Sequence, residues 1–193
     1  MGEGQGEGEI RASMNPEQRI IELDGAIDPE IARAIWGLWD TRRRTLKLLA
    51  RVDEAAIDWA PPDGGNTIGT LLYHIAAVEL SYLYEDILET QWAPELDPLL
   101  PYEMRTESGR LTPVHGESMA THLWRLDESR ALLLRTLATI SMDEMRRPRP
   151  VEQYIITPEW TLHHLMQHEA EHRGQIAELG RRASDSRENR IRS

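Results

Sequence analysis

The chain has 193 residues, of which 40% are hydrophobic and 28% are charged, and its formal net charge is −11. This length suits one domain with a sizeable core. The acidic balance argues against binding a nucleic-acid backbone, which needs a basic surface. No apolar run reaches the ~18 residues of a membrane span, and the acidic N-terminus lacks the pattern of a signal peptide. We therefore expect a cytoplasmic protein without nucleic-acid or membrane partners.

The first part of the chain predicts a tail and then a long helix. Residues 1–14 are rich in Gly and Glu, with almost nothing to bury, so we expect a flexible tail. A helix is predicted from Pro29 to about Val52, with Asp28 as its N-cap and proline at the first helical position. Residues 58–65 are rich in Pro, Asp and Gly, and they end this helix.

The middle of the chain predicts two further helices with a long connection between them. The second helix begins after the cap Asn66–Thr67 and runs to about Thr90. Residues 91–115 contain four prolines and no sustained period, which predicts a crossover loop. Irregular segments of this length in compact domains are often functional. The third helix is predicted from Gly116 or Glu117 to Ile140.

The last part of the chain predicts one more helix. Residues 148–157 are extended by prolines and β-branched residues, so a short strand or hairpin is expected there. Thr157 then caps a helix that starts with Pro158 and runs to about Arg182, and residues 184–193 form a polar C-terminal tail. Four long helices favour an all-α fold. We predict an antiparallel four-helix bundle over residues 15–183, with a long crossover loop between helices two and three.

Histidines are concentrated in the predicted fourth helix. His164, His168 and His172 are spaced by four residues, so they lie on one helix face, one turn apart. Two imidazoles at this spacing can reach one metal ion. His74 lies in the apolar face of the second helix, where a lone histidine is more often a packed core residue than a ligand. The interpretation of His74 as a ligand becomes stronger because a histidine pair on another helix needs a third partner.

Three histidines with open metal positions are typical of a catalytic zinc site rather than a closed structural one. Such a metal lowers the pKa of bound water to about 7, or holds a thiolate. Nickel, iron and manganese also suit imidazole ligands, and with no cysteine in the chain every ligand must be nitrogen or oxygen. His164, Glu169 and Arg173 are candidates for supporting the ligands or contacting the substrate. Gly174 costs helix stability, which suggests close helix packing at that position.

Two known metal patterns fit this segment less well. The run from His168 to His172 spells H-E-x-x-H, the zinc-protease pattern, but the extended form with a downstream third histidine is missing. A di-iron carboxylate bundle needs two Glu-x-x-His pairs. Glu169 and His172 supply one pair, whereas Leu71 stands where the second pair would need a glutamate before His74.

The segment Asn66-Thr-Ile-Gly-Thr-Leu-Leu-Tyr-His74, followed much later by His164-x3-His168-x3-His172-Arg-Gly-Gln-Ile, resembles the DinB/YfiT-like superfamily over about residues 28–183. The resemblance implies a four-helix bundle with a divalent metal, often nickel or zinc, held by three histidines. These map onto His74, His168 and His172. Characterised relatives are thiol-dependent transferases and isomerases that use bacillithiol, mycothiol or glutathione-like thiols. The long 91–115 segment departs from the simplest members of the family.

The leading hypothesis is therefore a divalent-metal-dependent enzyme that transfers or isomerises small molecules with an external low-molecular-weight thiol. The expected partners are a small-molecule substrate and a second copy of the chain in a homodimer. A metal-dependent hydrolase is one alternative. A non-catalytic metal- or ligand-binding bundle with a role in stress response is the alternative from a different class.

Overall fold

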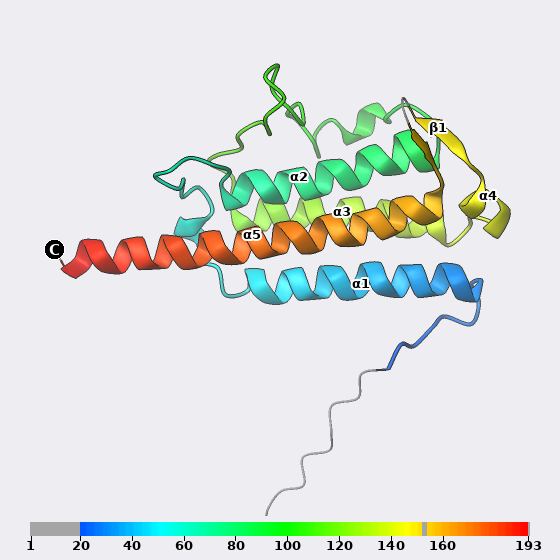
Figure 1. Ribbon diagram of the computed structural model, residues 1–193, viewed down its shortest axis with the longest axis horizontal. Coiled ribbons are helices and arrows are strands. Elements are labelled where there is room, and N and C mark those ends of the chain that lie inside the picture. The colour runs from blue at the N-terminus through cyan, green and yellow to red at the C-terminus, as the bar shows by residue number, and fades with distance from the viewer. Residues whose placement is uncertain (1–19, 152–153, 193) are drawn as a thin grey trace, which may run out of the picture.

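The computed structural model describes residues 20–151 and 154–192, so the tail predicted for residues 1–14 lies outside the described residues. The fold is mostly helical, as the sequence predicts for an all-α protein (Figure 1). Its α-helices are α1 (Pro29–Leu49), α2 (Ile68–Ser81), α3 (Met119–Leu137), α4 (Met142–Arg146) and α5 (Pro158–Arg192). Short 3-10 turns lie at η1 (Glu54–Ala56) and η3 (Pro94–Leu96), and a π-helical turn, η2 (Tyr82–Ile87), follows α2. Strands β1 (Arg149–Val151) and β2 (Tyr154–Ile156) pair antiparallel as a hairpin. None of the described helices combines the length and apolar character that crossing a membrane requires.

Side-chain caps fix where the long helices begin. The carboxylate of Asp28 accepts a hydrogen bond from the backbone N–H of Glu30, and the hydroxyl of Thr67 accepts one from Thr70. Thr157 caps α5 in the same way. All three caps were predicted, and each satisfies a backbone donor that the first helical turn leaves free. The start of α3 is later than predicted, because Ser118 is the residue that caps it.

Helices α1 and α3 end about three residues before the predicted ends at Val52 and Ile140, and the ends of α2 and α5 differ more. The chain after Ser81 continues as a wider π turn instead of an α-helix to Thr90. Helix α5 runs to Arg192, so residues predicted as a polar tail are helical. No proline interrupts this stretch, and Arg181 pairs with Glu178 and Asp185 one turn to either side, which stabilises an exposed helix.

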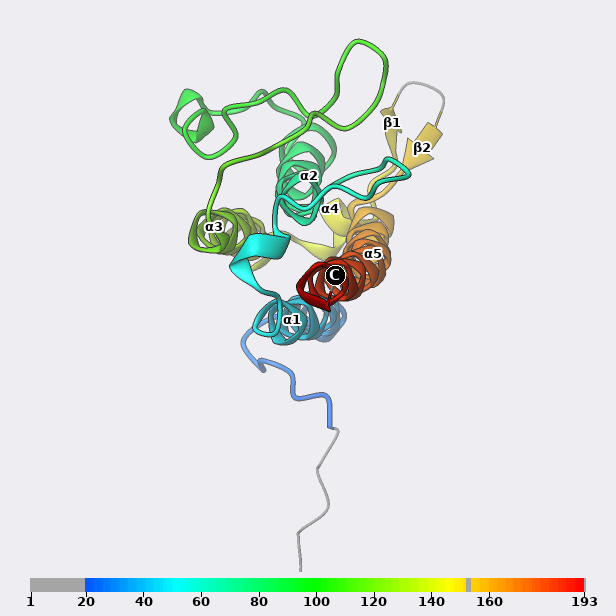
Figure 2. The same ribbon diagram turned by 90° about the vertical axis from the view of Figure 1, so that its left-hand side faces the viewer.

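The four long helices lie side by side, with α2 between α3 and α5, and α1 opposite α2 (Figure 2). Helix α5 runs antiparallel to α2, since Tyr82 lies against His164 while His74 lies against His172. Helices α2 and α3 run in the same direction, and so do α1 and α5. The parallel pairs arise because the long segment after α2 crosses back over the molecule before α3 begins (Figure 1).

Helix α2 is buried along its whole length from Ile68 to Leu80. Its neighbours cover part of its circumference, and the segment between α2 and α3 covers the rest. That segment is tied down where Tyr102 N donates to the hydroxyl of Tyr73, and where Val114 N donates to Thr70 Oγ1. A helix that is apolar all round is expected to be buried on every side, and this one places His74 in the interior.

Candidate metal centre

Three histidines from two antiparallel helices converge at one point. His168 Nε2 lies 3.2 Å from Nε2 of His74 and 3.0 Å from Nε2 of His172. The ligand atoms of all three residues lie within 4.8 Å of one another, so the group could hold a metal ion. Residues 168 and 172 are one turn apart on α5, and α2 brings in a residue from nearly a hundred positions earlier.

Burial keeps two of these side chains uncharged. It lowers the pKa of His74 to about 4 and that of His168 to about 3, with a smaller contribution in the same direction from His172. At neutral pH both imidazoles are therefore neutral, and neutral imidazole is the form that binds metals.

The nitrogen geometry fits a divalent metal with small adjustments. Three nitrogens at about 2.1 Å from a tetrahedral metal lie about 3.4 Å apart, a few tenths of an ångström more than the distances from His168 Nε2 to the other two Nε2 atoms. Gln175 Oε1 lies 3.0 Å from His172 Nδ1. An amide oxygen can only accept, so Nδ1 carries the proton and Nε2 keeps its lone pair for the cluster. Because His74 is buried and the other two are half-buried, the cluster has one covered side and one more open side.

The other residues predicted near the site have different surroundings. His164 lies between two aromatic rings, stacked on Trp160 with centroids 5.1 Å apart and 5.2 Å from the ring of Tyr82. Arg173 donates to the backbone carbonyl of Thr41 on α1. The explanation of Gly174 by close helix packing is wrong, because a Cβ atom there would meet nothing within 4 Å.

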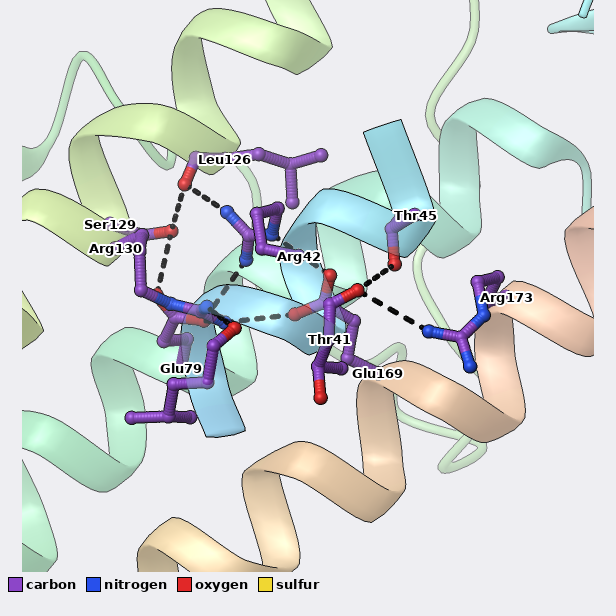
Figure 3. Close-up of polar contacts among 10 residues, drawn as sticks. Thr41, Arg42, Thr45, Glu79, Leu126, Ser129, Arg130, Glu169 and Arg173 are labelled. Atoms are coloured by element: carbon purple, nitrogen blue, oxygen red, sulfur yellow. Dashed lines mark hydrogen bonds and ion pairs between the residues drawn. The ribbon is translucent and has the colours of Figure 1, made fainter. Parts of the chain in front are cut away.

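The carboxylate of Glu169 pairs with arginines of α1 and α3 and belongs to a buried charge cluster (Figure 3). The cluster comprises Arg42 of α1, Glu79 of α2, Arg130 of α3 and Glu169 of α5, all at most 6% exposed. Arg42 donates to both carboxylates, at 3.0 Å to Glu79 and 2.9 Å to Glu169. Arg130 does the same at 2.7 and 2.8 Å. Two positive and two negative charges thus neutralise each other among the four helices.

Hydrogen bonds complete the environment of these charges. Arg42 also donates to the backbone carbonyl of Leu126, and Arg130 to that of Leu38. Burial alone would raise the pKa of Glu169, but Arg42 and Arg130 together outweigh burial and hold that pKa below its ordinary value. The Glu169 carboxylate therefore stays ionised at neutral pH, and its pairing with two arginines avoids the high cost of an unpaired buried charge.

The sequence carries a signal for this charge cluster. Arg42 and Arg130 occupy the apolar stripes of their helices, where a charged residue is normally excluded. A charge on a buried stripe implies an opposite charge on a facing helix. The sequence alone does not say which glutamates those are, since the chain has 33 acidic residues.

The fold and the histidine group together define a helical protein with a candidate metal site between two helices. A family model described as the DinB superfamily matches residues 38–176. The chain therefore belongs to the DinB superfamily. The crystal structure of a conserved protein from Enterococcus faecalis matches with a TM-score of 0.59 and 15% identity, over 77% of this chain and 93% of that one. At this identity the likeness shows the fold alone. None of the curated proteins matches this chain.

Proposed function

We propose that this protein is a divalent-metal-dependent enzyme acting on small molecules, with His74, His168 and His172 as the metal ligands. The convergence of three Nε2 atoms from α2 and α5 is the observation that carries the proposal. Imidazole ligands suit zinc, nickel and iron, and manganese is a further candidate. Three protein ligands leave at least one metal position for substrate, as in catalytic zinc sites.

The reaction we propose is transfer or isomerisation with an external low-molecular-weight thiol, of the bacillithiol or mycothiol type. The chain has no cysteine, so the sulfur must come from a cosubstrate. A divalent metal, when bound, supplies a Lewis acid that holds a thiol as its thiolate near neutral pH.

The protein's own residues position this chemistry. Gln175 fixes the orientation of the His172 ring through its contact with Nδ1. The buried charge cluster joins α2 and α5, the helices that carry the ligands, so it holds the histidines at a fixed separation. His164 lies beside His168, with ring centroids 6.0 Å apart, where it can contact a substrate next to the metal.

We also propose an architecture for this member of the superfamily. The four long helices form a four-helix bundle, and the segment between α2 and α3 is its long crossover loop. The contacts of α2 with α3 and α5, and of α1 with α5, support this assignment. A homodimer, a cytoplasmic location and a role in stress response stay predictions.

Metal content is the first test. The full chain, purified without a His tag and incubated with zinc, nickel or manganese, is analysed by mass spectrometry as wild type, His168→Ala and His163→Ala. We expect about one equivalent of metal in the wild type, and little in His168→Ala. His163 is exposed on the same helix, so His163→Ala should keep its metal. A wild type that binds none of the three metals would refute the proposal.

A conjugation assay tests the reaction. Metal-loaded protein is incubated with bacillithiol, mycothiol or glutathione and the electrophile monochlorobimane, and fluorescence reports the conjugate. We expect conjugation with at least one thiol, dependent on metal and lost in His168→Ala. Metal binding without conjugation by any thiol would reject the thiol chemistry and leave the hydrolase and the non-catalytic bundle as the remaining candidates.

A further inference from the structure

A cavity of about 770 Å³ lies between the end of α2, the hairpin and the start of α5. These three elements meet at the right-hand end of the molecule in Figure 1. Tyr82, Glu85 and Asp86 line the cavity from η2, while Ile156 and Trp160 line it from β2 and α5. A cavity of this size can enclose a molecule of ordinary metabolite dimensions.

Aromatic rings connect this cavity to the histidine group. Tyr82 and Trp160, which line the cavity, both lie against the ring of His164. His164 in turn lies one helical turn before His168, with ring centroids 6.0 Å apart. His164 therefore links the lining of the cavity to the histidine group.

The carboxylate of Asp86 is the unusual feature of this cavity. Asp86 is only 6% exposed, and its side chain makes no hydrogen bond or ion pair with any residue that the structure describes. Its backbone carbonyl accepts a hydrogen bond from Arg149, whose charge also attracts the carboxylate. Glu85, the preceding residue of the same π turn, brings a second carboxylate to the cavity. Buried carboxylates without partners are costly, and π turns occur frequently at functional sites.

The other walls favour a ligand with an apolar body. The rings of Tyr82 and Trp160 and the side chain of Ile156 present apolar surface. Among the described residues that line the cavity, Arg105 is the one cation, and it is exposed and already donates to the carbonyl of Gly109. Arg149 also attracts the Asp86 carboxylate, but it pairs with Glu144 and does not line the cavity. The charged groups that line the buried part of the cavity are therefore negative.

We propose that this cavity is the substrate pocket, and that it takes a small molecule with a primary ammonium group, which Asp86 binds with support from Glu85. The apolar part of the molecule lies against Tyr82, Ile156 and Trp160. An ammonium group supplies the donors that the Asp86 carboxylate lacks, and charge-assisted hydrogen bonds of this kind are strong. The inference rests on the proposed function, because it treats the bound molecule as the substrate of the metal centre.

Two matched probes test the charge preference. Phenethylamine carries an ammonium group at neutral pH, and phenethyl alcohol has a neutral hydroxyl at the same position. Both are titrated into the full chain and followed by NMR, with metal-free and zinc-loaded protein. The metal-free arm separates binding in the pocket from coordination of the amine to zinc. We expect the amine to bind about tenfold more tightly than the alcohol in both forms.

Two variants test whether Asp86 causes the preference for the amine over the alcohol. Asp86→Asn keeps the shape of the side chain without its charge, and we expect it to bind amine and alcohol alike. Asp97 is exposed and does not line the cavity, so Asp97→Asn should keep the wild-type preference. Circular dichroism confirms that each variant is folded. Equal affinities in the wild type, no binding of the amine, or an unchanged preference in Asp86→Asn would each overturn the inference, and the first two do not depend on a variant.

The same samples separate this inference from the proposed function. An amine preference in a protein that binds no metal would support the ammonium pocket and reject the metal-dependent enzyme. Metal binding together with equal affinities for amine and alcohol would reject the pocket and leave the metal centre standing.

Discussion

Nη2 of Arg130 lies 2.8 Å from Oε2 of Glu169, the residue that directly follows His168 in α5. The same guanidinium binds Glu79, which lies five residues after His74 in α2. The two helices that carry the candidate ligands are therefore joined through one arginine of a third helix. Because Glu169 and His168 point to different faces of α5, the charges fix the helix while the histidines remain free to face their own centre.

Removing one charge from this cluster should destabilise the fold. We expect Glu169→Gln to lower the free energy of unfolding by about 3 kcal/mol, because two buried arginines would then share a single carboxylate. Urea denaturation followed by circular dichroism measures the change. Glu171 is exposed two residues along the same helix, and Glu171→Gln should change stability by less than about 0.5 kcal/mol. Similar values for the two variants would contradict a structural role for the cluster.

Gln175 should affect metal affinity without being a ligand. We expect Gln175→Leu to weaken zinc binding about tenfold, because His172 loses the acceptor that orients its ring. Competition with a chromophoric chelator measures the affinity. Gln167 is exposed on the same helix, so Gln167→Leu serves as the control and should bind zinc as the wild type does. An unchanged affinity in Gln175→Leu would mean that packing alone holds the ring.

Asp86 should lower stability above about pH 6. Burial, and to a lesser degree Glu85, raise the pKa of Asp86 to about 6, from an ordinary value near 4. Near pH 4 and below, the carboxyl group costs little, because its folded form is protonated. As the pH rises through 6, the carboxyl group ionises within the folded protein, and the free energy of unfolding falls.

The side chain in Asp86→Asn does not ionise, so this variant should not lose stability in that way. Comparing its free energy of unfolding with that of the wild type across the pH range measures the effect. The variant should be more stable than the wild type at pH 7.5 by up to about 3 kcal/mol, and the difference should shrink towards zero near pH 4. Urea denaturation across this pH range tests the expectation. A constant difference at every pH would show that the effect comes from packing rather than from ionisation.

Two glycines should respond oppositely to alanine. A Cβ atom at Gly69 would lie 3.0 Å from His122 Nε2 and 3.1 Å from Ile57 Cγ2, so we expect Gly69→Ala to destabilise the protein by about 1–3 kcal/mol. A Cβ atom at Gly174 would meet nothing within 4 Å. Gly174→Ala should therefore gain about 0.5–1 kcal/mol from helix propensity. Thermal unfolding compares the two variants, and destabilisation by both would mean that the free space at Gly174 is not there in solution.

The sequence by itself determined the elements and the histidine helix. The caps at Asp28, Thr67 and Thr157 are local features, because a short polar side chain binds a backbone N–H two or three residues away. The spacing of His168 and His172 is equally local, since four residues make one helical turn. His74, on the apolar face of another helix, was a candidate third partner for this pair, and the family resemblance points to the same residue. All of these depend only on residues close in the chain or on a motif.

Only the tertiary structure decided how charges and cavities are shared between helices. Which glutamates pair with Arg42 and Arg130 depends on the rotation of four helices about their axes, and many acidic residues are equivalent in the sequence. Glu169 was expected near the histidines and instead pairs with arginines, because neighbouring residues on a helix point about 100° apart. Asp86 gains its unpaired buried carboxylate only because the π turn, the hairpin and α5 enclose one cavity. Periodicity describes which face of a helix is buried, whereas the partner on that face is set by packing between segments far apart in the chain.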